Sequence, residues 1–237
     1  MKYILIFILV LFTSCKTENS ETTSIDPPTY KQELVEKGQK MANELKYMLD
    51  ERGVDTGNIP SISVRNEPYL IFYNPTNNEV VVPWFEDLPV EMKTVMLDFA
   101  NAADMEGREF FQTFFNTFFY YHEFAHWGQY QMDGEINSDR YFSENEANEI
   151  TVAYLQSSEE GQNFLDTIEP KVNALVNFLE NPAPDGVSEE EYFNENYAQL
   201  GMNAYHYGYY QFKFVKNALD QRNSITLDEI VERRSKN

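Results

Sequence analysis

The feature that most constrains this chain is an aromatic run over residues 118–130 that contains the pattern His-Glu-x-x-His. If the run is helical, His122 and His126 lie four residues apart on one face of the helix. Two neutral imidazoles at that spacing can bind one zinc ion, and Glu123 projects beside them as a general base. A helix that is apolar on nearly all sides is buried, so we expect a core helix that shields a metal from bulk water. The aromatic residues in the turns before the motif are Phe110, Phe111, Phe114, Phe115, Phe118, Phe119, Tyr120 and Tyr121.

A simpler interpretation is a buried helix whose histidines only hydrogen-bond within the core. Only three histidines occur in the chain, and two of them fall in this pattern. Two buried histidines one turn apart would each need a separate hydrogen-bond partner. We therefore favour the metal-binding interpretation.

Composition limits the class of protein. The chain has 237 residues, and its 18 Lys+Arg against 39 Asp+Glu give a formal net charge of −21. This balance argues against charge-driven binding to nucleic acid or to anionic membrane surfaces. A hydrophobic content of 42% with 15% aromatic residues indicates a real core rather than a disordered chain. The length suits one compact domain, or one domain with a helical annex.

The first residues have the pattern of a targeting segment. Lys2 precedes a short apolar run at 3–12, which is too short to span a bilayer comfortably, and the run leads into Thr13-Ser14-Cys15. The stretch resembles a bacterial lipoprotein signal in which Cys15 is lipidated, although Phe12 stands where such signals usually carry Leu. An ordinary secretory peptide with a stray cysteine is the alternative.

The lipoprotein resemblance implies a protein anchored by lipid to the bacterial cell envelope, at the outer membrane on its periplasmic or surface face. Residues 1–15 would then be the signal, 16–29 a flexible tether and 30–237 the folded domain. Since Cys15 is the sole cysteine, no thiol remains as a metal ligand or nucleophile.

Hydrophobic periodicity predicts an α+β domain that is predominantly helical, with a small antiparallel sheet. Strands are expected at 62–64, 69–73 and 80–82, and the turn-forming residues 74–78 join the last two. Pro83 favours an edge position for the third strand, where an extended peptide could pair with it. Helices are expected at 30–52, from Pro89 to about 103, through the motif to about 132, and at 143–155, 162–179 and 189–219, with a short final helix after 224–228.

A hydrolytic zinc site needs a third protein ligand and an open position for water. Here the chain resembles gluzincins, the thermolysin-like zinc peptidases whose third ligand is a glutamate on a following helix. Asn145-Glu146-Ala147 is similar to the start of their ligand motif, and Glu146 lies twenty residues after His126. The resemblance implies a zincin-like fold, a Zn²⁺ cofactor and Glu146 as the third ligand.

Two related patterns support this resemblance over residues 70–155. Glu144 to Asn148 is similar to the glutamate helix of ImmA/IrrE-type peptidases, and the order of hairpin, helix and aromatic run resembles a family of secreted metallopeptidase-like proteins. The chain departs from the family pattern at Ile150, since an aspartate often lies there, four residues after the ligand glutamate. Glu149 or Asn148 would then have to orient a histidine.

The identity of the third ligand stays open between neighbouring carboxylates. Ser143-x-x-Glu146 also fits a capping box, in which the glutamate serves only the start of the helix. Glu144 and Glu149 are the other candidates for the ligand.

The function implied is that of a zinc metallopeptidase acting on a peptide or protein substrate, with Glu123 taking a proton from water. His206, on a later helix, is the candidate transition-state stabiliser, and its tyrosine neighbours Tyr205, Tyr207, Tyr209 and Tyr210 are alternatives.

The rival interpretation is a non-catalytic envelope lipoprotein with a zincin-like fold that binds peptide or glycan. Hydrolysis of peptidoglycan is disfavoured because its usual metal motifs are absent.

Overall fold

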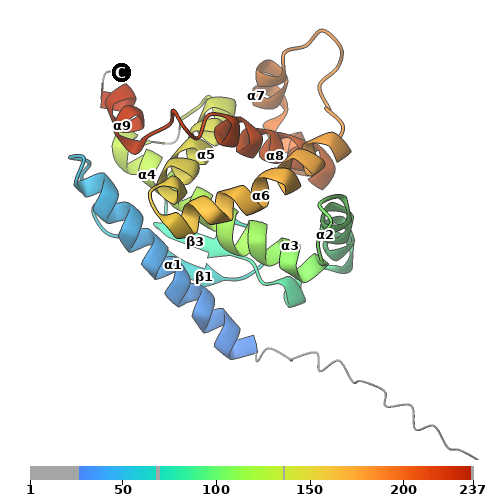
Figure 1. Cartoon of the computed structure of the whole chain (residues 1–237), viewed down its shortest axis with the longest axis horizontal. Helices are drawn as coiled ribbons and strands as arrows, with labels where there is room; N and C mark the ends of the chain where they lie inside the picture. The colour runs from blue at the N-terminus through green and yellow to red at the C-terminus, as the bar shows by residue number, and fades with distance from the viewer. Residues whose placement is uncertain (1–26, 68–69, 136, 236–237) are drawn as a thin grey trace, which may run out of the picture.

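Helices dominate the structure, and one small sheet lies between two of them (Figure 1). The structure is a computed structural model, and it describes residues 27–67, 70–135 and 137–235. The expected α+β class with predominant helix is confirmed. The predicted signal, with Cys15, and the tether as far as residue 26 lie outside the described residues.

The first helix, α1 (Pro27–Asp50), begins three residues before the predicted start at Tyr30. Its apolar face packs against the sheet and against the helix that carries the histidine motif. Gly38 makes the close approach possible, because a Cβ there would lie 1.8 Å from the Tyr120 hydroxyl oxygen. That hydroxyl donates a hydrogen bond to the Leu34 carbonyl at 3.0 Å. The residues buried along α1 are Leu34, Met41, Ala42, Leu45 and Leu49.

The sheet contains β1 (Ser61–Val64), β2 (Phe72–Asn74) and β3 (Glu79–Val82), in the order β1-β3-β2. The hairpin of β2 and β3 is confirmed as antiparallel, but β1 pairs parallel with β3, so the prediction of a purely antiparallel sheet was wrong.

The predicted edge position of β3 was also wrong, because β3 is the central strand. Pro83 follows the last paired residue, so its missing N–H is not needed in the ladder. The pairing of β1 with β3 is reinforced by Arg65, whose guanidinium donates to both carboxylate oxygens of Glu79 at 2.8 and 3.0 Å.

The motif lies on one long helical segment. After the short 3₁₀ turn η1 (Phe85–Asp87) and helix α2 (Val90–Ala102), the segment runs through α3 (Gly107–Thr113), the π-helical turn η2 (Phe114–Phe118) and α4 (Phe119–Asp133). A π turn inserts one residue and so rotates the residues that follow it. Asn116 lies in this turn, is buried, and donates to the Pro83 carbonyl at 2.9 Å. Gly134, with φ 75°, ends α4 in the left-handed conformation.

The remaining helices pack around α5 (Arg140–Gln156), which contacts α4 as well as α6 (Glu159–Phe178), α7 (Glu189–Leu200), α8 (Ala204–Asp220) and α9 (Leu227–Ser235). The single helix expected at 189–219 was wrong. Residues 201–203 break it, and the Asn203 side chain caps α8 by accepting from the amides of Tyr205 and His206. The final helix is confirmed, with Thr226 and Glu229 forming a reciprocal cap.

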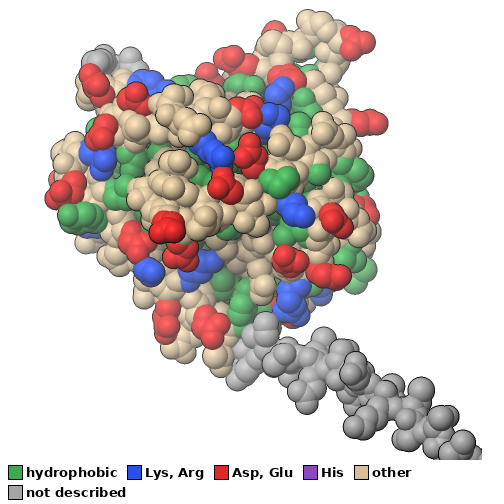
Figure 2. Space-filling view, viewed as in Figure 1, with side chains coloured by type: hydrophobic (Ala, Val, Ile, Leu, Met, Phe, Trp, Pro, Cys, Tyr) green, Lys and Arg blue, Asp and Glu red, His purple; other side chains and the backbone are tan. Residues whose placement is uncertain are grey.

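Charged side chains of both signs are interspersed on the face drawn in Figure 2. Figure 2 shows acidic side chains scattered over the visible face, with lysines and arginines between them. Within the described residues, no helix is long and apolar enough to cross a membrane.

Candidate metal centre

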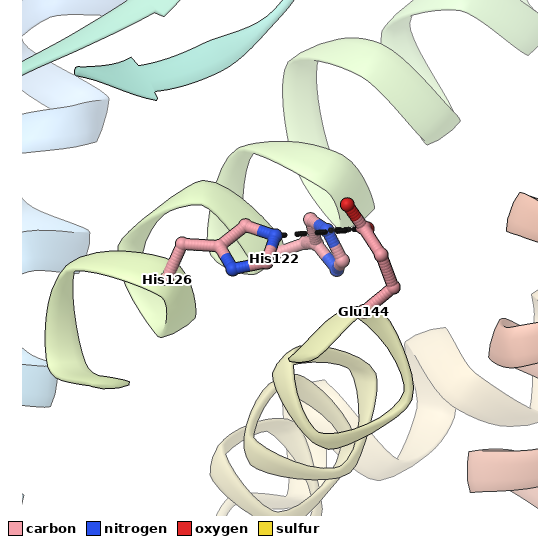
Figure 3. A group of neighbouring side chains, drawn as sticks. All are labelled: His122, His126 and Glu144. Atoms are coloured by element: carbon pink, nitrogen blue, oxygen red, sulfur yellow. Dashed lines mark hydrogen bonds and ion pairs between the residues drawn. The ribbon is translucent and has the colours of Figure 1, made fainter. Parts of the chain in front are cut away.

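Helices α4 and α5 bring His122, His126 and Glu144 together (Figure 3). The two imidazoles project from one face of α4 toward the Glu144 carboxylate, which comes from α5. Glu144 Oε2 lies 3.1 Å from His122 Nε2 and 3.6 Å from His126 Nε2. Only 5% of the surface of Glu144 and 2% of that of His122 is exposed.

The grouping of the three side chains leaves room for a small cation, since their ligand atoms lie within 4.8 Å of one another. Zinc–ligand bonds of about 2.0–2.1 Å in a tetrahedral arrangement place neighbouring ligand atoms roughly 3.3 Å apart. The two distances from Glu144 lie on either side of that value. Two imidazole nitrogens and one carboxylate oxygen are a donor set that suits zinc and leaves a fourth position open.

The tautomer of His126 strengthens this interpretation. The Gln129 amide nitrogen donates to the Ser143 carbonyl and to Glu146, each at 3.0 Å, which leaves the amide oxygen facing His126 Nδ1 at 2.8 Å. His126 must therefore carry its proton on Nδ1. In the neutral ring, Nε2 then presents a lone pair to the Glu144 carboxylate, and the two repel unless a proton or a metal ion lies between them.

His122 lacks an equivalent outer partner. Its Nδ1 is buried and has no hydrogen-bond partner in the described part of the chain. Metal-binding histidines usually donate their second N–H to a carbonyl or carboxylate. The centre is therefore asymmetric, with the orientation of His126 fixed by hydrogen bonding and that of His122 by packing, including a ring contact with Phe119 at 6.0 Å between centroids.

Glu144 is held by neutral donors as well as by the histidines. The Gln211 amide donates to Oε2 at 3.0 Å, and the Tyr197 hydroxyl donates to Oε1 at 3.3 Å. Burial alone would raise the pKa of Glu144, but hydrogen bonds to the two histidines hold it well below its usual range. Burial alone would lower the pKa of His126, yet the hydrogen bond and charge of Glu144 raise it to about 9. Glu144 is thus an anion, as a ligand must be.

Glu146, the ligand implied by the resemblance, does not face the histidines. Residues two apart on a helix point roughly 200° apart, so Glu144 and Glu146 cannot share one face of α5. Glu146 accepts instead from Gln129 at 3.0 Å, from Arg234 Nε at 2.6 Å and from Arg233 at 3.2 Å. It orients His126 indirectly, through Gln129.

Neither a capping box at Ser143 nor ligation by Glu149 matches the observed contacts. The capping box at Ser143 was wrong, because α5 begins at Arg140 and Asp139 caps it by accepting from the Phe142 amide. Glu149 pairs with Arg233 at 2.6 Å and is not one of the grouped side chains. Of the three carboxylates considered, Glu144 is the one that meets both histidines.

No known protein family, curated protein or solved structure matches this chain. The arrangement of the described side chains therefore carries the functional assignment.

Glu123 lies beside the histidines with 7% of its surface exposed. Its Oε2 accepts a hydrogen bond from the backbone amide of Tyr73, in strand β2, at 2.7 Å. Burial raises the pKa of Glu123, while the two histidines oppose that rise. A carboxylate with a raised pKa at this place can take up a proton.

A cavity of about 970 Å³ opens onto the centre. Its walls include His122, Glu123, His126 and Glu144, together with apolar side chains from β2, α2, η2 and α8. Such concave, mostly apolar spaces with a few converging polar groups are typical of ligand sites.

His206, the candidate transition-state stabiliser, is exposed and does not line this cavity. Its neighbour Tyr207 does, as does Tyr197 from α7, and the two rings meet edge to face with centroids 6.2 Å apart. Burial, followed by the charge of Glu144, raises the pKa of both phenols. Both side chains therefore keep their protons and can donate hydrogen bonds.

Sequence reasoning missed Gln129, Tyr197 and Gln211. Gln129 carried a usable signal, since it lies three residues after His126 and so shares its helix face. Tyr197 and Gln211 carried none, because only tertiary packing brings α7 and α8 to Glu144.

Paired substitutions distinguish the two glutamates. We expect Glu144→Gln to lower zinc affinity by about 100-fold or more, because it removes a ligand, and Glu146→Gln by about 10-fold, because it disturbs only an outer hydrogen bond. The affinities are measured by competition with a chromophoric chelator. Glu149→Gln, which loses only the contact with Arg233, is the control and should bind zinc like the unmodified protein. A greater loss in Glu146→Gln than in Glu144→Gln would contradict the assignment.

Proposed function

We propose that this protein is a zinc-dependent metallopeptidase with a zincin-like, gluzincin-related centre formed by His122, His126 and Glu144. The observation that carries the proposal is the convergence of His122 Nε2 and His126 Nε2 on one buried carboxylate oxygen of Glu144, with the Nδ1 atom of His126 held by Gln129. The three side chains would hold a divalent cation in place of the protons that otherwise lie between the imidazoles and the carboxylate. His122 Nε2, at 3.1 Å from the same oxygen, supplies the third ligand.

The chemistry then follows from the side chains around the centre. A zinc ion bound there would supply Lewis acidity, which would lower the pKa of a bound water toward about 7 and polarise a carbonyl. Glu123 accepts the proton of the attacking water and later passes it to the leaving amine. The Tyr73 amide holds one Glu123 oxygen in place, which reduces the reorganisation that this proton transfer requires.

Tyr207 and Tyr197 replace His206 as the proposed donors to the oxyanion that forms at the scissile carbonyl. Both line the cavity and remain protonated, whereas His206 lies on the surface. Tyr197 donates to Glu144 and Tyr207 interacts with Tyr197 rather than donating to Glu144, so Tyr207 is proposed as the donor.

The cavity suits an extended peptide segment with apolar side chains, since its lining includes Met92, Phe99, Phe115 and Phe212. Strand β2, rather than β3, is the edge strand next to α4. Its outward amide at Tyr73 is used by Glu123, so pairing of substrate with that amide is not part of the proposal. The rival, a non-catalytic protein that binds peptide or glycan, predicts bound zinc without hydrolysis.

Substitution of the general base tests the proposal. Glu123→Gln should retain zinc and fold but lose peptide hydrolysis by about 10²- to 10⁴-fold, because the amide cannot accept the proton of water. Digestion of a peptide library, with and without a chelator, measures the loss. Glu109→Gln, at an exposed position on α3, is the matched control. Unchanged hydrolysis in Glu123→Gln would contradict the proposal. If the unmodified protein binds zinc but hydrolyses no peptide, the result favours the non-catalytic interpretation.

The oxyanion donor is tested separately. Tyr207→Phe should lower kcat by roughly 10- to 1,000-fold with little change in KM, because the hydroxyl acts mainly in the transition state. His206→Ala should stay within about twofold of the unmodified enzyme, since its side chain is exposed and lies outside the cavity. Steady-state kinetics on one cleaved peptide measures both. A larger loss of kcat in His206→Ala than in Tyr207→Phe would instead support His206 as the transition-state stabiliser.

We also propose that Cys15 is lipidated and anchors the protein to the bacterial cell envelope, on the strength of the residues before it. Cells fed a labelled fatty acid should incorporate label into the protein, and Cys15→Ser should abolish it because no other cysteine exists. Label retained in Cys15→Ser would refute the anchor without bearing on the metal centre.

A further inference from the structure

One arginine stands apart from the others. The chain has seven arginines, and every one except Arg140 pairs with a carboxylate, as the distances from Arg52, Arg65, Arg108, Arg222, Arg233 and Arg234 to their partners show. No carboxylate of residues 27–67, 70–135 and 137–235 lies within ion-pair distance of Arg140. With 39 acidic residues against 18 basic ones, an arginine without an acidic partner is unexpected.

Arg140 lies in the wall of the cavity that opens onto the candidate metal centre. It is partly buried, lines the same cavity as the two histidines, and lies over the Tyr197 ring at 5.7 Å from the ring centroid. Tyr197 in turn donates to the ligand carboxylate of Glu144. Arg140 and Glu144 are four residues apart on α5, so they occupy the same helix face about one turn, or roughly 6 Å, apart along the axis.

The neighbouring charges explain why Arg140 stays available. Asp139, the adjacent carboxylate, caps α5 and accepts from Phe142 and Asn194 at 2.9 and 3.0 Å. The other arginine of the cavity, Arg234, is bound to Asp133 and Glu146. The wall also carries the side chains of Glu123, Glu135 and Glu144. Of the two arginines that line the cavity, Arg140 is the one without a carboxylate partner among the described residues.

We propose that Arg140 binds a carboxylate of the substrate, one or two residues from the bond that is cleaved. Guanidinium groups pair with carboxylates through two parallel hydrogen bonds. An extended chain advances about 3.3–3.6 Å per residue, so a group one helical turn from the centre is reached within one or two residues. The inference rests on the proposed peptidase function and adds its substrate class.

The carboxylate has two chemical sources. A free C-terminus at Arg140 makes the enzyme one that removes single residues or dipeptides from chain ends. An aspartate or glutamate side chain makes it an endopeptidase selective for acidic sites. Both present the same anion to the guanidinium, and the peptide ends used in the experiment distinguish them.

The experiment uses the zinc-loaded full chain and one decapeptide library synthesised with free and with amidated C-termini. Cleavage sites are read by mass spectrometry, and kcat/KM is then measured on one cleaved peptide and on its carboxylate-free analogue. We expect the carboxylate to raise kcat/KM by roughly 10- to 100-fold, as for a charge-assisted hydrogen bond. In Arg140→Gln the ratio of kcat/KM between the carboxylate-bearing and the carboxylate-free peptide should fall to about threefold or less.

Arg108→Gln is the matched control, because Arg108 pairs with Glu86 and does not line the cavity, and it should keep the full preference. Zinc content and circular dichroism establish that both variants fold. If amidation of the peptide C-terminus abolishes cleavage, the carboxylate bound by Arg140 is the C-terminus. If amidated peptides are cleaved only near Asp or Glu, the carboxylate is that of a side chain. Either result supports the inference. Cleavage that ignores carboxylates, or a preference that survives in Arg140→Gln, overturns the inference alone. Absence of all cleavage by the unmodified protein overturns it together with the proposed function.

Discussion

A carboxylate and two imidazoles meet inside a helix interface, and a positive charge has to lie among them. Glu144 is buried at the contact of α4 and α5, and its Oε2 lies close to both histidine Nε2 atoms. In a buried place such charges interact more strongly than in water, and an unmatched one destabilises the fold. The hydrogen bonds and packing around these three side chains keep the carboxylate and the imidazoles in place.

The outer hydrogen bonds connect the centre to parts of the chain that are distant in sequence. Glu146 lies behind His126 and links Gln129 to Arg234, which comes from the last helix, α9. Tyr73, from the sheet, orients Glu123. Buried ion pairs add little net stability on average, so the contact of Arg234 with Glu146 is better understood as fixing the orientation of Gln129 and His126 than as stabilising the fold.

The sequence of the aromatic segment before the motif indicates its burial but not its full backbone geometry. Eight aromatic residues predicted a buried helix, and the helix is buried. The π turn at η2 was not predicted, because a single inserted residue leaves the composition of such an apolar helix unchanged. The parallel pairing of β1 with β3 was missed for a related reason. Strand periodicity specifies which residues alternate between the two faces of a sheet, but it does not specify the direction in which two strands pair.

Within one helix, the sequence by itself determined the essential geometry. The spacing of His122, Glu123 and His126 places them on adjacent positions of a turn wherever the helix lies, and the aromatic residues ensure that it is buried. Tertiary structure decided which carboxylate completes the group. Glu144 and Glu146 are both acidic, both on α5 and nearly equally distant from His126 along the chain, so only the rotation of α5 against α4 distinguishes them. That rotation, like the break that gives α8 its own start and leaves His206 on the surface, is set by packing between helices that no local pattern records.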